Sequence, residues 1–230
     1  MKLSIIIPVY NEAETIVQTV AKACEAPLPG GVEREIIVVN DGSNDETLAA
    51  LQFFKNHPLV RILSFKTNRG KTAAQLAGIQ AARGNTLLFQ DADLEYDPRH
   101  YQKLVEPVLQ GKFRVVFGSR FLGEMRGMNP FIRLANQFNT WSVNQLYAAS
   151  LTDVNTGYKV ISKELFDQIP ISSGRFGGDA ELTARLLKRG EPIQEIAIDY
   201  QARRKKAGKK MNSFSAIHMY FCFFFLRTVR

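Results

Sequence analysis

The first ninety residues alternate between short apolar runs and helical patterns, and this alternation is the strongest constraint on the fold. The apolar runs lie at residues 3–9, 35–39, 60–64 and 87–89. The helical patterns lie at residues 13–26, 44–56 and 72–83. Strands that are apolar at nearly every position are buried on both faces, and short connections to helices favour parallel neighbours. We therefore predict an α/β fold with a doubly wound, mostly parallel, Rossmann-like sheet flanked by helices.

The second half of the chain continues this pattern less regularly. Helices are expected at residues 100–110, 130–149 and 179–189, strands at 113–119, 154–162 and 193–200, and a loop at 121–129. A capping box, Ser43-x-x-Glu46, is expected to start the helix that ends at Asn56. The 230 residues are enough for one domain with a sizeable core. We predict one catalytic domain over residues 1–205 and a basic, aromatic tail over residues 206–230.

Three carboxylates, Asp91, Asp93 and Glu95, follow the fourth apolar run at alternate positions. Ligands of open α/β sheets bind outside the carboxyl ends of the strands, where this stretch is expected to lie. Three crowded carboxylates repel one another unless a positive charge joins them, and a hard divalent cation that holds a substrate phosphate would do so. From these residues alone, a metal site and a solvated acidic loop before Asp97 are both open.

Net charge and missing motifs narrow the class of ligand. A formal net charge of +8 favours an anionic partner: nucleic acid, a phosphorylated substrate or a membrane surface. Neither G-x-G-x-x-G after the first strand nor G-x-x-x-x-G-K-[ST] occurs, so the usual dinucleotide and P-loop signatures are absent. The two cysteines, Cys24 and Cys222, form no CxxC pair, which argues against a zinc site and suggests a reducing compartment.

Three spaced motifs together resemble the family 2 glycosyltransferases of the GT-A fold. They are the segment from Ser4 to Glu12 (SIIIPVYNE), the segment from Val38 to Thr47 (VVNDGSNDET) and Asp91-Ala92-Asp93. Later motifs are similar to those of the polyprenyl-phosphate glycosyltransferases, the group of dolichol-phosphate mannose synthase. These are Gly118-Ser119-Arg120-Phe121, Leu151-Thr152-Asp153, Thr156-Gly157-Tyr158-Lys159, Tyr200-x-x-Arg203 and Gly208-Lys209-Lys210. The resemblance covers nearly the whole chain.

This resemblance implies a nucleotide-sugar donor, a polyprenyl-phosphate acceptor and Mg²⁺ or Mn²⁺ as cofactor. The residues that it places around the donor are Pro8, Tyr10, Glu12, Asp41, Asp91, Ala92, Asp93 and Arg120. It places Asp93 and the residue two further on, here Glu95, at the metal. Relatives often carry Gln at this second position, so the role of Glu95 is the less certain of the two. Arg120 and Arg203 would neutralise phosphates.

The acceptor decides which catalytic groups the enzyme needs. A sugar hydroxyl needs a general base, whereas a lipid phosphate is largely ionised at neutral pH because its second pKa is roughly 6. An ionised acceptor needs cations to place it, and Arg120, Arg203 and Lys210 are the candidates for that role. Asp179, at the start of a predicted helix, is the rival signal. It is either the base for a hydroxyl acceptor or a carboxylate that stabilises the helix N-terminus.

The carboxyl-terminal tail is predicted to be an amphipathic membrane-interface segment. Its aromatic part is flanked by basic residues, which favours attachment to an anionic leaflet. Its longest apolar run, residues 216–226, is too short to span a bilayer, which needs about 20 residues. The helix from Pro130 is expected either on the same membrane surface or in a core or homo-oligomer contact. No nucleic-acid partner is expected, because aromatic residues are not interleaved with the basic run.

These expectations describe a metal-dependent, inverting hexosyltransferase. It would move a hexose from a nucleotide-sugar of the GDP-mannose or UDP-glucose type to a dolichyl or undecaprenyl phosphate. The enzyme would be cytoplasmic and attached peripherally to the cytoplasmic face of the membrane. Asp93, Arg120 and Arg203 would form its catalytic set. One alternative is a glycosyltransferase that acts on a sugar or protein hydroxyl with Asp179 as base. A second is a non-catalytic membrane module that binds nucleotide-sugars without turnover.

Overall fold

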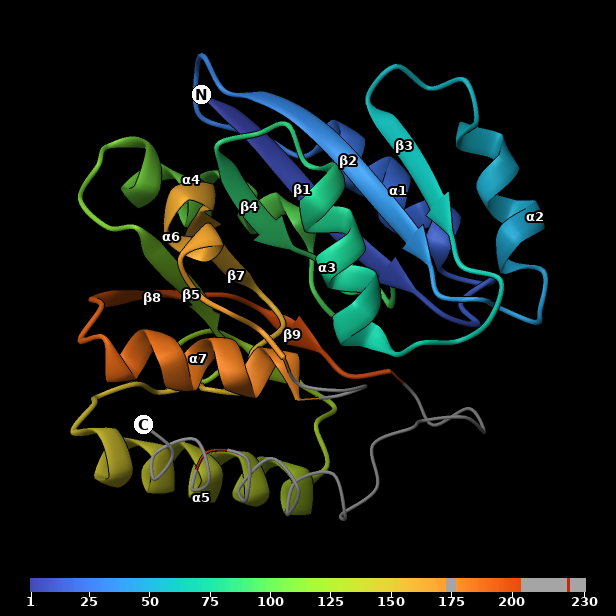
Figure 1. The fold of residues 1–230 in the computed structure, drawn as a ribbon. Coiled ribbons are helices and arrows are strands. Elements are labelled where there is room, and N and C mark those ends of the chain that lie inside the picture. The colour runs from blue at the N-terminus through green and yellow to red at the C-terminus, as the bar shows by residue number, and fades with distance from the viewer. Residues whose placement is uncertain (173–176, 204–222, 224–230) are drawn as a thin grey trace.

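The protein was analysed as a computed structural model, which describes residues 1–172, 177–203 and 223. A seven-stranded sheet forms its centre, with the strand order β3-β2-β1-β4-β7-β5-β8 (Figure 1). Neighbouring strands run parallel except at β7, which is antiparallel to both β4 and β5. The predicted α/β fold with a mostly parallel sheet is therefore confirmed.

The elements follow one another in the order that the sequence indicates. The strands are β1 (Lys2–Val9), β2 (Glu33–Asn40), β3 (Val60–Ser64), β4 (Thr86–Phe89), β5 (Val115–Ser119), β6 (Met125–Arg126), β7 (Lys159–Ser162), β8 (Ile193–Ala197) and β9 (Tyr200–Gln201). The helices are α1 (Ile16–Glu25), α2 (Thr47–Leu51), α3 (Lys71–Ala81), α4 (Tyr101–Leu109), α5 (Pro130–Tyr147), α6 (Lys163–Asp167) and α7 (Gly178–Lys188). Short 3₁₀ turns, η1 (Gln52–Phe54) and η2 (Pro98–His100), follow α2 and precede α4.

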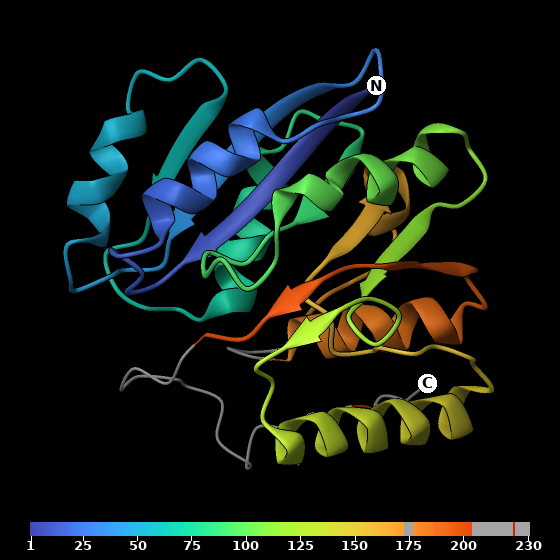
Figure 2. The same ribbon diagram turned by 180° about the vertical axis from the view of Figure 1, so that it is seen from behind.

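Helices cover both faces of the sheet, as the apolar character of the strands requires. Alternate residues of β1 face opposite sides: Ile5 packs with the cluster around α1 and α4, and Ile6 packs with the cluster around α3, α6 and α7. Helix α3 lies in front of β1 and β2 in Figure 1, and α1 lies behind them, as the reverse view in Figure 2 shows. The side chains of both isoleucines are fully buried. Helix α5 is the outermost layer, below α7.

Two local expectations are wrong. The capping box does not form: Ser43 Oγ accepts from the backbone N–H of Asn11 (3.0 Å), and Asp45 Oδ1 accepts from that of Thr47 (3.0 Å), so α2 begins later than expected. The expected loop at residues 121–129 contains β6, which pairs in parallel with β9 through Met125 and Tyr200. Tyr200 also forms a β-bridge with Tyr96. The chain after β8 therefore lies beside the acidic stretch that follows β4.

The tail falls almost entirely outside the described residues. The domain boundary at residue 205 and the predicted amphipathic segment over residues 206–230 therefore stay predictions. Phe223, the one tail residue that is described, is buried, and its carbonyl accepts a hydrogen bond from Tyr147 Oη of α5 (2.9 Å). Among the described residues, no helix combines the length and the apolar character needed to cross a bilayer.

Candidate active site

The sheet brings the predicted motifs to one edge. Strands β1, β2, β4 and β5 are parallel, so their carboxyl ends lie together, and the antiparallel β7 begins at the same edge. The loops that follow β1 and β4 carry Glu12 and Asp93, and the start of β7 brings Gly157 next to Asp91. A side chain larger than hydrogen at position 157 would overlap the Asp91 carboxylate. Glycine therefore leaves room for the Asp91 carboxylate, and a larger residue would force that side chain to shift.

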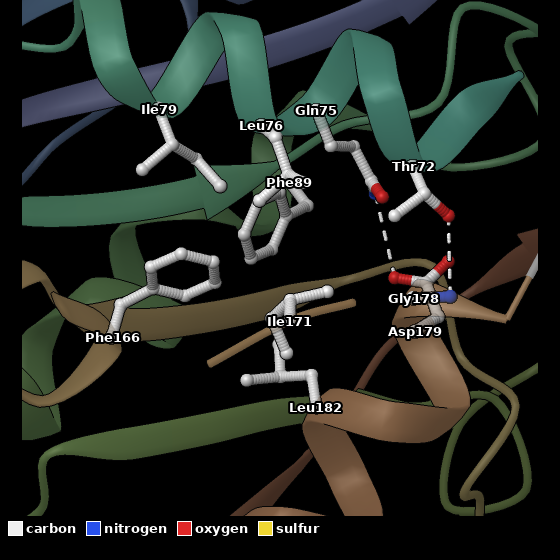
Figure 3. Close-up of a pocket in the computed structure, with 10 residues that line it drawn as sticks. All are labelled: Thr72, Gln75, Leu76, Ile79, Phe89, Phe166, Ile171, Gly178, Asp179 and Leu182. Atoms are coloured by element: carbon white, nitrogen blue, oxygen red, sulfur yellow. Dashed lines mark hydrogen bonds between the residues drawn. The ribbon is translucent and has the colours of Figure 1, made fainter. Parts of the chain in front are cut away.

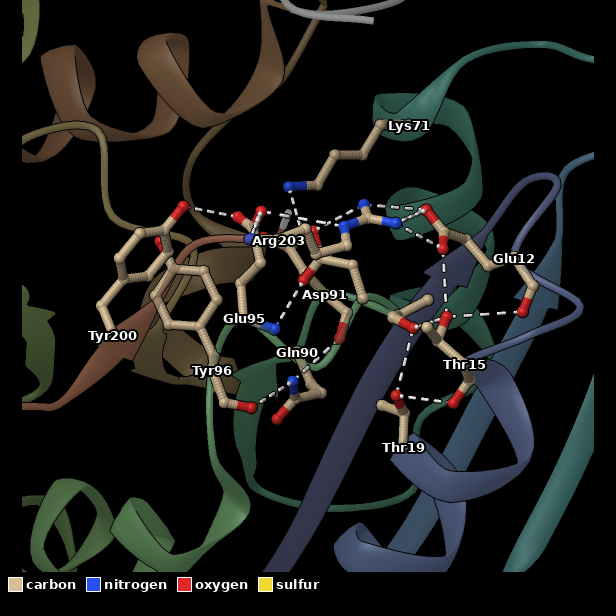
Figure 4. Close-up of polar contacts among 12 residues, drawn as sticks. Glu12, Thr15, Thr19, Lys71, Gln90, Asp91, Glu95, Tyr96, Tyr200 and Arg203 are labelled. Carbon is tan, nitrogen blue, oxygen red and sulfur yellow. Dashed lines mark hydrogen bonds and ion pairs between the residues drawn. The ribbon is translucent and has the colours of Figure 1, made fainter. Parts of the chain in front are cut away.

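Buried polar groups fix the backbone of the acidic stretch. The hydroxyls of Thr15 and Thr19, one turn apart at α1, both donate to the carbonyl of Ala92 (2.8 and 3.1 Å; Figure 4). On the other side, Gln90 Nε2 donates to the carbonyl of Asp91 (2.8 Å). Leu94 has a positive φ of 58°, a conformation that is uncommon for a non-glycine residue and is often found at functional sites. These contacts hold the acidic side chains in fixed directions.

One guanidinium lies among three carboxylates at this edge. The Arg203 nitrogens Nη1 and Nη2 contact both oxygens of Glu12 (2.8–3.0 Å), and Nη2 also contacts Asp93 Oδ2 (3.0 Å; Figure 4). Its Nε lies 3.7 Å from Glu95 Oε1. The structure thus joins Glu12, the acidic stretch with Asp93 and Glu95, and Arg203, which come from three distant parts of the sequence.

Asp93 lies in a strongly electronegative position. Burial, with repulsion from Asp91 and Glu95, raises the pKa of Asp93 to about 7, although Arg203 acts in the opposite direction. A carboxylate oxygen that already faces a positive group, in a site with an excess of acids, suits a hard divalent cation. Among the described residues, no group of three or more acidic, histidine or cysteine side chains is placed to hold a metal by itself. Mg²⁺ or Mn²⁺ would therefore take few protein ligands here, with Asp93 as the candidate and substrate phosphate or water as the rest. The assignment of Asp93 as a metal ligand stays a prediction.

Glu95 is directed into the protein. Its Oε2 accepts from Tyr200 Oη (2.5 Å), and its Oε1 accepts from the backbone N–H of Arg203 (3.2 Å). Its side chain is only 9% exposed. Glu95 thus holds the segment that carries Arg203, and a metal bound to Asp93 would find both oxygens of Glu95 already hydrogen-bonded. Metal ligation by Glu95, which was predicted from its spacing, is not tested by this arrangement.

Lys71, the first residue of α3, links the acidic stretch to α7. Its ammonium lies 2.7 Å from Asp91 Oδ1 and 3.2 Å from Asp179 Oδ2. Burial would raise the pKa of Asp179, but Lys71 and the buried Lys159 outweigh this effect and lower it to about 2. A carboxylate with so low a pKa is a weak proton acceptor at neutral pH.

A small pocket lies beside this ion pair, between α3, β4 and α7 (Figure 3). Its polar end is formed by Asp179, which accepts a hydrogen bond from Gln75 Nε2 (3.4 Å), and by Thr72, whose hydroxyl accepts from the backbone N–H of Gly178 (3.2 Å). The remaining walls are apolar and are formed by Leu76, Ile79, Phe89, Phe166, Ile171 and Leu182. These two hydrogen bonds hold the start of α7 and the direction of the Asp179 carboxylate.

Arg120 lies at the same edge but is buried. Its Nε and Nη2 donate to the two oxygens of Asp153 (2.7 and 2.8 Å), and its backbone N–H donates to Asp153 as well (3.1 Å). The guanidinium also lies over the ring of Tyr200, 5.3 Å from its centre. Two nitrogens of the guanidinium, Nε and Nη2, thus donate hydrogen bonds inside the protein. The predicted contact of Arg120 with donor or acceptor phosphate stays untested.

The predicted nucleoside-binding residues lie along the first two loops. Asp41 is buried and accepts hydrogen bonds from the backbone N–H groups of Arg69 (2.7 Å) and Gly70 (2.9 Å) and from Asn68 Nδ2 (2.8 Å). It therefore orders the loop before α3. Pro8 and Tyr10 are partly buried, within and just beyond the end of β1. Lys210 lies outside the described residues.

The chain matches a known protein family over most of its length. Residues 4–170, which include the motifs after β1, β2 and β4, match the model of the family described as glycosyl transferase family 2. The chain belongs to glycosyl transferase family 2. The resemblance predicted from the motifs is confirmed at this level, and with it the classification as a glycosyltransferase.

Curated relatives of this family 2 glycosyltransferase include proteins named for lipid-phosphate sugar transfer. Glycosyltransferase AglD of Haloferax volcanii is 29% identical over 88% of this chain and 34% of the relative. Dolichol-phosphate mannosyltransferase of Pyrococcus furiosus is 27% identical over 75% of this chain and 49% of the relative. Dodecaprenyl-phosphate galacturonate synthase of Rhizobium johnstonii is 28% identical over 91% of this chain and 62% of the relative. The chain therefore spans between about a third and three fifths of these three relatives.

Solved structures share the fold. Glucosyl-3-phosphoglycerate synthase of Mycobacterium tuberculosis, crystallised with Mn²⁺, UDP-glucose and phosphoglyceric acid, has a TM-score of 0.77 at 19% identity and covers 100% of this chain and 80% of the other. At this identity the comparison establishes the GT-A-like fold.

Several residues of this candidate site were not predicted from the sequence. Lys71 follows Asn68-Arg69-Gly70 and precedes a predicted helix, but nothing in its neighbourhood shows that it reaches Asp91 and Asp179. Thr15 and Thr19 have the spacing of one helical turn, which indicates a shared face without indicating its partner. Tyr200 was recorded as part of a motif, and only the structure shows its hydrogen bond to Glu95.

Proposed function

We propose that this glycosyltransferase moves a hexose from a nucleotide-sugar of the GDP-mannose or UDP-glucose type to a polyprenyl phosphate. The observation that carries the proposal is the convergence of Asp93, Glu12 and Glu95 with Arg203 at the carboxyl edge of the sheet. This site combines acidic ligands for a metal with a guanidinium for a phosphate. The printed names of two relatives, which refer to dolichol phosphate and dodecaprenyl phosphate, support the acceptor class.

The donor would lie along the loops that follow β1, β2 and β4. Pro8, Tyr10 and Asp41 would line the nucleoside, and Asp91 and Ala92 would line the diphosphate and the sugar. Asp93 would hold Mg²⁺ or Mn²⁺, and the ion would offset the negative charge that develops on the departing diphosphate. The related structure that contains Mn²⁺ and UDP-glucose supports a divalent ion in a site of this fold.

The acceptor phosphate would be placed by arginine rather than activated by a base. In this proposal an acceptor oxygen forms a bond to the anomeric carbon while the bond from that carbon to the diphosphate breaks on the opposite side, which inverts the configuration. Arg203, 43% exposed, presents a fork that suits a phosphate, and Arg120 and Lys210 are the further candidates. A screen of nucleotide-sugars for Mn²⁺-dependent thermal stabilisation, followed by transfer to undecaprenyl phosphate, tests this function. Stabilisation without any transfer would favour a binding module.

The alternative function, transfer to a hydroxyl, depends on Asp179. We expect Asp179→Asn to retain transfer to lipid phosphate within about tenfold, because no proton must be removed from an ionised acceptor. Some loss is expected because Lys71 would lose one of its two carboxylates. Initial rates with saturating donor check this result, and Asp167→Asn, which neutralises an exposed carboxylate that pairs with Lys163 on α6, serves as the control. A loss of 10³-fold or more, without a change in donor affinity, would identify Asp179 as a base.

The exposed face of α5 would rest on the membrane surface. Phe131, Leu134, Phe138 and Trp141 recur at helical spacing, and each is between 58% and 83% exposed. Aromatic and aliphatic side chains on one helix face are typical of interfacial attachment. This face would place the site at the cytoplasmic surface of a bilayer, where the lipid phosphate lies.

We expect the protein to float with anionic liposomes at low salt, and Phe131→Ser/Trp141→Ser to reduce the bound fraction at least about threefold. Leu48→Ser/Phe53→Ser, which removes two exposed apolar residues from the opposite end of the sheet, is the matched control. A wild-type protein that remains at the bottom of the gradient but forms a homo-oligomer that is lost in the α5 variant would assign this face to self-association instead.

A further inference from the structure

The guanidinium of Arg203 lies among the carboxylates that include the proposed metal ligand Asp93. It contacts carboxylates from two separate loops, Glu12 after β1 and Asp93 with Glu95 after β4. Three carboxylates around one guanidinium leave an excess of negative charge. In this arrangement Arg203 is the counter-ion that offsets part of the repulsion between Asp93 and Glu95.

A metal ion and this guanidinium compete for the same oxygen. Mg²⁺ binds a carboxylate oxygen at about 2.1 Å. The Nη2 of Arg203 lies 3.0 Å from Asp93 Oδ2, so both cations could contact this oxygen only at a separation of a few ångströms. Like charges at that separation repel strongly in a partly buried site. A metal that binds Asp93 through Oδ2 would therefore push the guanidinium away from this oxygen.

The main chain of Arg203 is anchored, which confines this movement to its side chain. The backbone N–H of Arg203 donates to Glu95 Oε1 (3.2 Å), and Tyr200, three residues earlier, donates to Glu95 Oε2. Strand β9 is also paired with β6. The guanidinium is 43% exposed, and its Nη1 and Nη2 also contact both oxygens of Glu12, so loss of the Asp93 contact would leave it held by Glu12.

We infer that Arg203 is a built-in competitor of the metal: it neutralises the acidic loop until a metal displaces it from Asp93, and it is then released to bind a phosphate. This inference rests on the proposed metal-dependent function and adds an order of events to it. The metal-free site is closed by its own cation, so metal binds well only when the diphosphate of the donor arrives with it. The same event delivers Arg203 to the acceptor side.

The test is the binding of Mn²⁺ alone, measured by electron paramagnetic resonance, with and without UDP. We expect Arg203→Gln to bind Mn²⁺ about fivefold more tightly than the wild type, the scale of one lost ion pair. The same variant is expected to transfer the sugar more slowly, because it lacks the phosphate fork. Tighter metal binding together with slower transfer is not expected of a residue that only maintains the fold.

Arg126→Gln is the matched control. It removes one positive charge from β6, the strand next to β9, where Arg126 forms an exposed ion pair with Glu124, and it should leave Mn²⁺ affinity within about twofold. If Arg203→Gln binds Mn²⁺ no more tightly than the wild type, with and without UDP, the inference is wrong and the proposed function stands. If neither protein binds Mn²⁺ with UDP or with GDP, the metal site itself is wrong, and the inference fails with it.

Discussion

Asp93→Ala is expected to lower sugar transfer by about 10³-fold or more and to abolish the dependence of donor binding on Mn²⁺. Asp93 has the carboxylate that faces a cation at the edge of the sheet, while both oxygens of Glu95 are engaged inside the protein. Without Asp93 the ion would lose its main protein ligand, and the departing diphosphate would carry its charge unassisted. Transfer rates and calorimetric titration with UDP and Mn²⁺ measure the two effects.

The stability of the same variant separates a functional loss from unfolding. Burial and neighbouring acids raise the pKa of Asp93 to about 7, so the folded protein binds this proton more tightly than the unfolded chain does. Ionised Asp93 therefore disfavours folding, and its contribution becomes less favourable as the pH rises toward 7. We expect the Tm of Asp93→Ala at pH 8 to be unchanged or higher than that of the wild type.

Two further variants control this prediction. Asp93→Asn keeps an oxygen that can accept from the backbone N–H of Glu95 (3.2 Å), so it preserves the loop while removing the charge, and it should lose metal dependence as fully as the alanine variant. Asp167→Ala removes an exposed carboxylate that pairs with Lys163 on α6 and should leave transfer unchanged. Metal-dependent transfer by Asp93→Ala within tenfold of the wild-type rate would contradict the assignment.

The fold was predictable because its signals are local. The apolar runs of β1, β2 and β4 show burial on both faces, and the patterns between them have helical spacing, so a parallel sheet follows from residues close in the chain. The insertion of β7 between β4 and β5 was not predictable in this way. Its partners lie more than 40 residues away along the chain, and nothing within Lys159–Ser162 specifies an antiparallel direction.

The site was predictable in position but not in its contacts. The acids after β4 had to lie at the carboxyl edge, and the motifs indicated donor and metal binding there. The pairing of these acids depends on residues distant in the sequence: Lys71 reaches Asp91, and Arg203 reaches Asp93. The charge pattern of the sequence shows that crowded carboxylates need positive partners, whereas the identity of each partner depends on the three-dimensional packing. The inward direction of Glu95 is the clearest example, because its spacing equally allowed a metal ligand.

The same limit applies to Arg120, which leads to the second large prediction. Removing either partner of the buried Arg120–Asp153 pair is expected to cost about 3–5 kcal/mol of unfolding free energy, because the remaining charge would be buried without its counter-ion. Asp153 is fully buried, and the side chain of Arg120 is 7% exposed. Urea denaturation of Asp153→Ala and Arg120→Ala measures this loss. The double variant Arg120→Met/Asp153→Leu, which leaves no buried charge, should recover most of it.

This series also decides between two roles for Arg120. If Arg120 acts through the pair, transfer should fall in both single variants in step with their stability, since the guanidinium lies over the ring of Tyr200, which in turn binds Glu95. The stable double variant would then regain much of the rate. If Arg120 contacts a phosphate instead, the double variant would fold well and remain inactive, because stability can be restored by apolar packing whereas a phosphate contact cannot.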